Sequence, residues 1–240
     1  MTQQNTAAAR RRFATAAMAG ILLYVLVDVV LQFLPPHYSV ISDAESNLAV
    51  GPFGWIMNLN FLGRTVTTVC ALAAINSIGP DTMHRRTGTG LMLAGGLSSA
   101  ILAFFPTDVE NGDGILEVTT VGSVHLYVAA SGFLAALAGI WILTRWIRSS
   151  HELASAYPAA LAFTVIAGAG LASLILTTIM TPELLGLAER ICLAGLLGWV
   201  LAVCAAIRKL PLRNAPEFNA PEFGAPEMVD GGAGPTRSIR

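Results

Sequence analysis

The sequence has few charged residues, and this scarcity sets the class of protein. Only 12% of its 240 residues are Asp, Glu, Lys or Arg, whereas 54% are hydrophobic. Soluble domains carry about 25% charged residues, because a surface that faces water needs them. The composition therefore excludes an ordinary soluble protein and indicates a chain that faces lipid over much of its surface.

The sequence also lacks the residues and motifs of several functional classes. Its three cysteines, Cys70, Cys192 and Cys204, lie inside apolar runs, where neither a disulfide framework nor zinc-ligand spacing is indicated. There is no Walker A motif, no dinucleotide fingerprint and no Gly-x-Ser-x-Gly elbow. His125 is the only histidine inside an apolar run, which excludes bis-histidine haem ligation there. We expect no metal, no cofactor and no nucleic-acid partner.

Six apolar runs are long enough to cross a bilayer, which needs about 20 mostly apolar residues. They cover residues 13–34, 55–78, 88–105, 119–143, 157–180 and 184–207. The first run is longer than the apolar part of a signal peptide and has no clear cleavage site, so we interpret it as a spanning helix. The sequence predicts an all-α protein, a polytopic membrane bundle of six transmembrane helices.

The basic residues indicate the orientation of this bundle. Every Arg or Lys that flanks a run lies on one side: Arg10, Arg11, Arg12, Arg85, Arg86, Arg145, Arg148, Arg208, Lys209 and Arg213. The opposite loops, 35–54, 106–118 and 181–183, hold only acidic charges: Asp43, Glu45, Asp108, Glu110, Asp113, Glu117 and Glu183. Because basic loops stay in the cytoplasm, we expect both termini to be cytoplasmic and the bundle to lie in the plasma membrane.

The chain divides into a short cytoplasmic N-terminus (1–12), a transmembrane domain (13–208) and a tail (209–240). The tail repeats Asn/Gly-Ala-Pro-Glu-Phe/Met three times. A proline in every fifth position blocks helices and strands, so the pattern predicts a disordered cytoplasmic tail. It is either a neutral linker or a partner-binding motif that uses Phe218 and Phe223.

The first outer loop has the pattern of an ordered segment. Ser42 and Glu45 have the spacing of a capping box, and Gly51 followed by Pro52 can end a short helix. Two interpretations stay open. The loop is a simple amphipathic cap on the bundle, or it is a lid that places Asp43, Glu45 and Asn47 over a site.

Five ionisable residues lie inside the apolar runs, where such residues are costly and usually face the bundle interior. They are Asp28, Arg64, His125, Glu189 and Arg190. The helix rise places them at a similar depth of roughly 8–13 Å from the outer ends of their helices. The sequence predicts one polar cluster open to the outside, which either fixes helix packing or leaves a cavity for a ligand or a proton.

Several segments carry a resemblance to a known family. They are the loop from Tyr38 to Asn58, Phe105-Pro-Thr-Asp108, Gly122-Ser-Val-His125 and Glu189-Arg190. Over residues 15–207 the sequence resembles the prokaryotic membrane family called domain of unknown function 998. The resemblance implies a six-helix bacterial or archaeal membrane protein with no settled activity. It implies roles for the outer loop, Asp108, His125 and the Glu189–Arg190 pair, but not for Arg64, which stands where a small or apolar residue is expected.

Three functional hypotheses remain open. The first is a module that binds or transports a small polar solute or a lipid headgroup, with cations or zwitterions favoured by the acidic loops. The second is an intramembrane enzyme that acts on a lipid-linked substrate and uses His125 with Asp108 or Asp28, although no nucleophile is evident and no catalytic residue is assigned. The third is a passive assembly partner. The candidate ligand-binding residues are Asp28, Arg64, Asp108, His125, Glu189 and Arg190.

Overall fold

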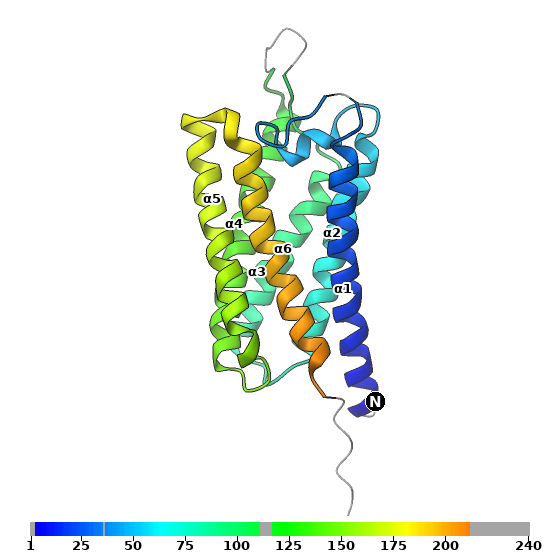
Figure 1. Ribbon diagram of the computed structural model, residues 1–240, viewed down its shortest axis with the longest axis vertical. Helices are drawn as coiled ribbons and strands as arrows, with labels where there is room; N and C mark the ends of the chain where they lie inside the picture. The colour runs from blue at the N-terminus through cyan, green and yellow to red at the C-terminus, as the bar shows by residue number, and fades with distance from the viewer. Residues whose placement is uncertain (1–2, 36, 111–116, 212–240) are drawn as a thin grey trace, which may run out of the picture.

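The computed structural model describes residues 3–35, 37–110 and 117–211, and all regular structure within them is helical. Six long helices form the molecule, and Figure 1 shows them side by side along its long axis. They are α1 (Gln3–Leu31), α2 (Gly54–Asn76), α3 (Met83–Leu102), α4 (Thr120–Ser149), α5 (Tyr157–Met180) and α6 (Leu185–Lys209). Three short 3₁₀ helices lie in the loops: η1 (Glu45–Ala49), η2 (Ala154–Ala156) and η3 (Pro182–Leu184). The predicted all-α class is confirmed.

The long helices form a closed ring. Each helix packs against the next one in the chain, and α6 packs against α1 to complete the circle. Successive helices run in opposite directions, so the start of α1 and the end of α6 lie at the same end of the bundle (Figure 1). There the Arg11 guanidinium donates a hydrogen bond of 2.9 Å to the carbonyl of Leu210.

Small residues let the helix backbones approach closely, as is typical of helix packing in membranes. A Cβ atom on Gly195 of α6 would collide with the backbone of Ala167 of α5. A Cβ atom on Gly139 of α4 would lie 2.8 Å from the backbone nitrogen of Met92 of α3. These two helix pairs therefore depend on glycine for their spacing.

Within the part of the chain that the structure describes, four helical segments are long and apolar enough to cross a membrane: Asn5–Leu31, Thr120–Ser149, Ala154–Met180 and Pro182–Lys209. Helices α2 and α3 are less apolar, since α2 includes Asn60 and Arg64 and α3 begins near Arg85 and Arg86. Large hydrophobic side chains, such as Leu26 and Val165, are exposed on the outside of the bundle. Long apolar helices together with an apolar outer surface are the features of a membrane protein.

Two groups of buried side chains hold the bundle together. The larger one fills the middle and the end at which α1 begins and α6 ends, and in it the Trp199 indole donates a 2.8 Å hydrogen bond to Thr144. The smaller one lies at the opposite end and combines α1 and α2 with the first loop. In it, Leu48 and Ala49 of η1 pack with Met57 and Phe61 of α2. The first loop is therefore part of the core.

Some helix boundaries differ from the sequence prediction. Helix α1 begins at Gln3, well before residue 13, and α4 continues to Ser149, beyond residue 143. Hydropathy marks only the part of a helix that suits lipid, whereas Ala and Arg, which favour helix, extend α1 past its apolar run. The predictions for Asp113 and for the repeats beyond Pro211 lie outside the described residues.

Candidate functional site

The first loop, between α1 and α2, is anchored by Glu45, but not in the way that the capping-box pattern predicted. Helix η1 is preceded by Ala44 and has no side-chain cap, and the Ser42 hydroxyl bonds Asp43 instead. The capping-box prediction is therefore wrong. The Glu45 side chain turns into the bundle, where only 4% of the residue is exposed and its carboxylate accepts a 2.7 Å hydrogen bond from the Tyr24 hydroxyl. A carboxyl group with a buried hydroxyl partner satisfies its bonding there instead of at the helix end.

Glu45 connects three helices at once. Its Oε2 atom lies 3.9 Å from Nη1 of Arg64 on α2, and its own backbone N–H donates a 2.6 Å hydrogen bond to Oε2 of Glu189 on α6. Arg64 Nη1 also donates to the hydroxyl of Tyr24 on α1 at 3.0 Å. These contacts tie the loop to α1, α2 and α6 through a single residue.

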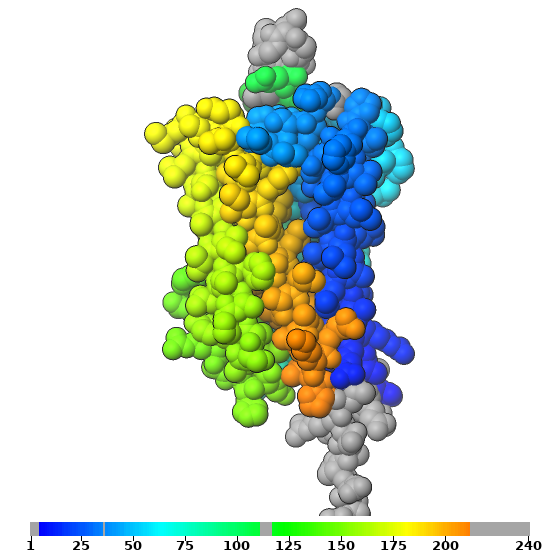
Figure 2. Space-filling model, in the orientation of Figure 1, coloured from blue at the N-terminus to red at the C-terminus, as the bar shows by residue number. Residues whose placement is uncertain are grey.

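Arg190 holds the other side of the same loop. Its guanidinium donates a 2.6 Å hydrogen bond to the Tyr38 hydroxyl and lies 3.7 Å from Oδ1 of Asp28 on α1. It also donates to the backbone carbonyls of Val40 and Asp43. Figure 2 shows the loop in the space between the ends of α1 and α6. We call the residues Tyr24, Asp28, Glu45, Arg64, Glu189 and Arg190, together with Tyr38, the loop network.

The charges of the loop network do not balance. Three carboxyl groups face two guanidinium groups, since Asp28, Glu45 and Glu189 surround Arg64 and Arg190. Removal from water raises the pKa of the Glu45 carboxyl, although the nearby Arg64 opposes the change. Glu45 is therefore easier to protonate than an exposed glutamate.

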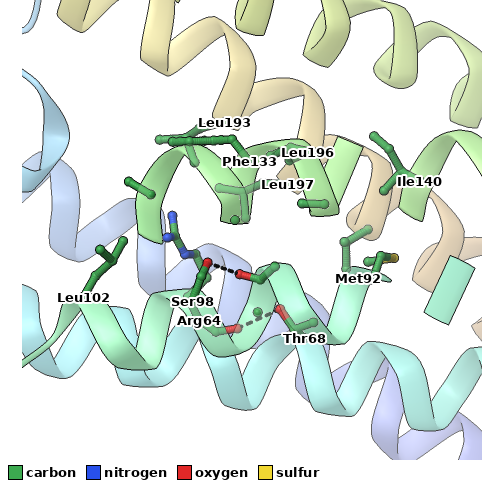
Figure 3. Close-up of a pocket in the computed structure, with 16 residues that line it drawn as sticks. Arg64, Thr68, Met92, Ser98, Leu102, Phe133, Ile140, Leu193, Leu196 and Leu197 are labelled. Carbon is green, nitrogen blue, oxygen red and sulfur yellow. Dashed lines mark hydrogen bonds between the residues drawn. The ribbon is translucent and has the colours of Figure 1, made fainter. Parts of the chain in front are cut away.

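A partly open cavity of about 80 Å³ lies between α2, α3, α4 and α6 (Figure 3). Its wall is mainly apolar: Leu102 of α3, Phe133 and Ala136 of α4, and Leu193 and Leu196 of α6. Arg64 is the one charged residue of this lining, and Ser98 and Thr68 are among its polar residues. The cavity is thus an apolar space with a cation at its edge.

Arg64 belongs to both the loop network and the cavity wall. Its Nε donates a 2.6 Å hydrogen bond to Ser99, and its Nη1 donates to Tyr24. Its Nη2 has no hydrogen-bond partner among residues 3–35, 37–110 and 117–211, and 17% of the side chain is exposed. In Figure 3 the guanidinium extends from α2 toward the part of the cavity near Phe133 and Leu193. A guanidinium has five donors, so Arg64 keeps donors for a molecule in the cavity.

His125 and Asp108 form a second group. His125 is 4% exposed, and its Nδ1 lies 2.6 Å from the carbonyl of Phe105. The Asp108 carboxylate accepts hydrogen bonds from the backbone N–H and the hydroxyl of Thr119, and these two bonds lower its pKa. No hydrogen bond or ion pair within the described ranges joins either residue to the loop network. The two residues instead fix the end of α3 and the start of α4.

The sequence identified part of this arrangement. The structure brings Asp28, Arg64, Glu189 and Arg190 together, as intramembrane charge predicted. Among the lid residues, Glu45 enters the network, Asp43 contributes a backbone carbonyl to Arg190, and Asn47 bonds within η1 through its backbone. Tyr38 and Ser99 were missed, because a loop tyrosine and a buried serine carry no pattern of their own. Tyr24 shares a helix face with Asp28, which was a usable signal.

These features define the chain as an all-helical membrane protein with a loop network at one end and a cavity beneath it. Residues 18–206 match the model of the family described as "Protein of unknown function (DUF998)". The chain belongs to this family. It matches no curated protein and no solved structure.

Proposed function

We propose that all six long helices span the plasma membrane, with the chain ends in the cytoplasm. Helices α2 and α3 lie between α1 and α4 in the closed ring. A bilayer that surrounds α1 and α4 therefore also surrounds α2 and α3. The start of α1 and the end of α6 lie together, at the end of the bundle that carries Arg10, Arg11 and Lys209. The positive-inside rule then puts the loop network on the outside.

We further propose that the protein binds a small amphipathic anion in its cavity, and not the cation or zwitterion that the acidic loops favour, because the described cavity lining carries a guanidinium and no carboxylate. The observation that carries this proposal is the free Nη2 of Arg64 at the edge of an apolar space. A half-buried cation with an unused donor beside apolar side chains favours a negatively charged group. The ligand's acidic head would lie against Arg64, and its apolar part would lie among Leu193, Leu196 and Phe133.

The cavity limits the size of the apolar part. A volume of about 80 Å³ is about half of the 150 Å³ cavity that holds benzene in another protein. This favours a chain of a few carbons, or the end of a longer chain, over a bulky solute. The mainly apolar wall likewise favours an amphipathic ligand over a fully polar one.

Asp43, Glu45 and Asn47 fit a lid in this proposal, because their loop covers the outer end of the same bundle. Asp108 and His125 fit a supporting role at the α3–α4 connection. His125 contacts a backbone carbonyl, and Asp108 contacts Thr119. The described contacts give the two residues no shared proton path, so a binding or transport function is favoured over an enzyme.

A series of carboxylates of increasing length tests the proposal. Acetate, butyrate, hexanoate and octanoate would be titrated into purified protein in nanodiscs and followed by calorimetry. Each added CH₂ group that enters the cavity should tighten binding by about 0.8 kcal/mol, roughly fourfold. The gain should stop once the cavity is full. Hexan-1-ol and hexylammonium, which match hexanoate in length, should bind more weakly.

Two pairs of variants complete the test. Arg64→Gln should weaken hexanoate binding by about tenfold or more, the value of a lost charged hydrogen bond, and should leave hexan-1-ol unaffected. Ala136→Leu should fill the cavity and weaken both ligands, whereas Ala138→Leu, on the exposed face of the same helix, should not. Equal binding of hexanoate and hexan-1-ol would exclude Arg64 as the head site. Equal effects of Ala136→Leu and Ala138→Leu on binding would exclude the cavity as the site that holds the apolar part of the ligand.

A further inference from the structure

Glu45 and a ligand in the cavity would compete for the same guanidinium. The Glu45 carboxylate approaches Arg64 from the loop, at 3.9 Å from Nη1, while the cavity meets the same side chain from inside the bundle. The Tyr24 hydroxyl bridges Glu45 and Arg64, because it donates to the Glu45 carboxylate and accepts from the Arg64 guanidinium. An anion that moves onto Arg64 therefore changes the surroundings of Glu45 directly.

Among the described residues around Glu45, no cation is free to replace Arg64 as the partner of the Glu45 carboxylate. Helices α1, α2 and α6 pack against η1. Helix α1 contributes Tyr24 and Asp28, α2 contributes Arg64, and α6 contributes Glu189 and Arg190. Arg190 is already held by Asp28, by Tyr38 and by loop carbonyls. The loop's own Asp43 carboxylate bonds Ser39 and Ser42.

A bound anion would place a fourth negative group against two guanidinium groups. An unpaired charge in a buried site is costly, and a carboxyl group in that position takes up a proton instead. Of the three carboxyl groups in the loop network, Glu45 is the one that forms an ion pair with Arg64, and burial already raises its pKa. Protonation would leave the Glu45 carboxyl able to keep its hydrogen bond with Tyr24.

We propose that binding of an anion at Arg64 is coupled to the uptake of one proton by Glu45. This inference rests on the proposed function and adds to it a proton that binds together with the anion. The proton comes from the aqueous side of the loop and binds the Glu45 carboxylate, while the ligand stays anionic, so the net charge of the loop network with its ligand is unchanged. A transporter built on this coupling would move the anion together with a proton.

The coupling predicts a pH dependence with a definite sign. The liganded protein holds one proton more than the free protein wherever Glu45 is ionised in the free state. Affinity should therefore be constant below the raised pKa of free Glu45 and should fall about tenfold per pH unit above it. Simple carboxylate ligands stay ionised throughout the range of about pH 6 to 9, so their own titration does not contribute.

Calorimetry in paired buffers measures the proton directly. Hexanoate would be titrated at several values between about pH 6 and 9, each in two buffers with different heats of ionisation. The difference in apparent binding heat gives the number of protons taken up. The coupling predicts a value that rises toward one with increasing pH. A value of zero at every pH, with normal binding, would contradict the coupling and leave the proposed function intact.

The variant Glu45→Gln assigns the proton to its residue. It should bind hexanoate with no proton uptake and with an affinity that does not change over the same pH range. Unchanged uptake in this variant would overturn the assignment to Glu45. If the variant does not fold, infrared difference spectra of the wild type still decide, since hexanoate should produce a protonated-carboxyl band. A total lack of hexanoate binding would instead overturn the site itself, and the coupling with it.

Discussion

At the scale of single residues, Tyr24 joins the two buried charges that matter most. Its hydroxyl donates to Glu45 and accepts from Arg64, and only 3% of the residue is exposed. Tyr24→Phe removes both bonds without changing the shape of the core. Leaving a buried polar group without its partner costs about 1–3 kcal/mol, so the free energy of unfolding should fall by about that much.

Tyr127→Phe is the matched control for this prediction, because Tyr127 is 75% exposed on α4. Both variants would be unfolded thermally in the same detergent. Equal stability of the two variants would show that the Tyr24 hydroxyl contributes nothing to the loop network.

The sequence predicted the charged members of the network better than the neutral ones. Asp28, Glu189 and Arg190 stand out because ionisable residues in apolar runs need partners. Glu45 did not, since a glutamate in an acidic loop is ordinarily solvated. Its spacing from Ser42 suggested a cap, but the buried hydroxyl of Tyr24 and the guanidinium of Arg64 compete successfully for its carboxylate. Only the folded chain brings those groups within reach of the loop.

At the scale of elements, the start of α4 depends on Asp108. Its carboxylate binds the N–H and hydroxyl of Thr119, and Thr119 in turn caps the helix by accepting from Gly122. These bonds lower the pKa of Asp108, so its contribution to stability is present above its unfolded pKa and is lost as the pH falls through the folded value. Asp108→Asn should lower the unfolding temperature by a few degrees near neutral pH.

Thermal unfolding between about pH 3 and 7 checks this prediction. The difference between Asp108→Asn and the wild type should shrink as the pH falls, whereas Glu110→Gln, at an exposed position two residues on, should give no such trend. A difference that is constant with pH would exclude a contribution from the ionised carboxylate.

The pair of α5 and α6 gives a sharper test of backbone packing. Gly195→Ala puts a methyl group against the backbone of Ala167, which cannot rotate away. Overpacking of this kind typically costs about 1–3 kcal/mol. Gly168→Ala on α5 meets nothing within 4 Å and should leave the free energy of unfolding unchanged or raise it by up to about 1 kcal/mol, because Ala favours helix more than Gly does. Similar stabilities for the two variants in an unfolding titration would contradict the close contact.

Helix identity was predictable from apolar runs, whereas helix ends were not. Each of the six apolar runs coincides with one long helix, although only four helical segments of the described residues are apolar enough by themselves to cross a membrane. Hydropathy placed the start of α1 at residue 13, although the helix begins at Gln3. The ladder of backbone hydrogen bonds continues past the apolar run until a cap or a helix breaker stops it.

At the scale of the whole molecule, the sequence could not predict the closed ring or the cavity. The matched depth of Asp28 and Glu189 indicated a cluster at one end, and the structure brings both to the first loop. The apolar space beside Arg64 depends on how side chains of four helices fill the centre. The pattern of residues along a single helix does not reveal how side chains from several helices pack together.

Orientation in the membrane is a prediction that cysteine labelling can test. His37 and His151 are exposed at opposite ends of the bundle, one in the first outer loop and one between α4 and α5. Each would be changed to cysteine in a variant whose native cysteines are replaced by alanine. An impermeant thiol reagent should label His37→Cys in intact cells and His151→Cys only after the cells are permeabilised. The reverse pattern would invert the topology.

Photo-crosslinking is the measurement that tests the binding proposal most directly. The probe is a carboxylate of hexanoate length with a diazirine at the end of its tail, added to the protein in nanodiscs and followed by peptide mapping. If the ligand binds in the cavity, the probe should crosslink to the cavity wall at Phe133, Ala136 and Leu196. Excess hexanoate should compete with the probe, and Arg64→Gln should reduce the yield. Crosslinks confined to lipid-facing residues such as Leu22 and Ile179, unaffected by hexanoate or by Arg64→Gln, would contradict the binding proposal.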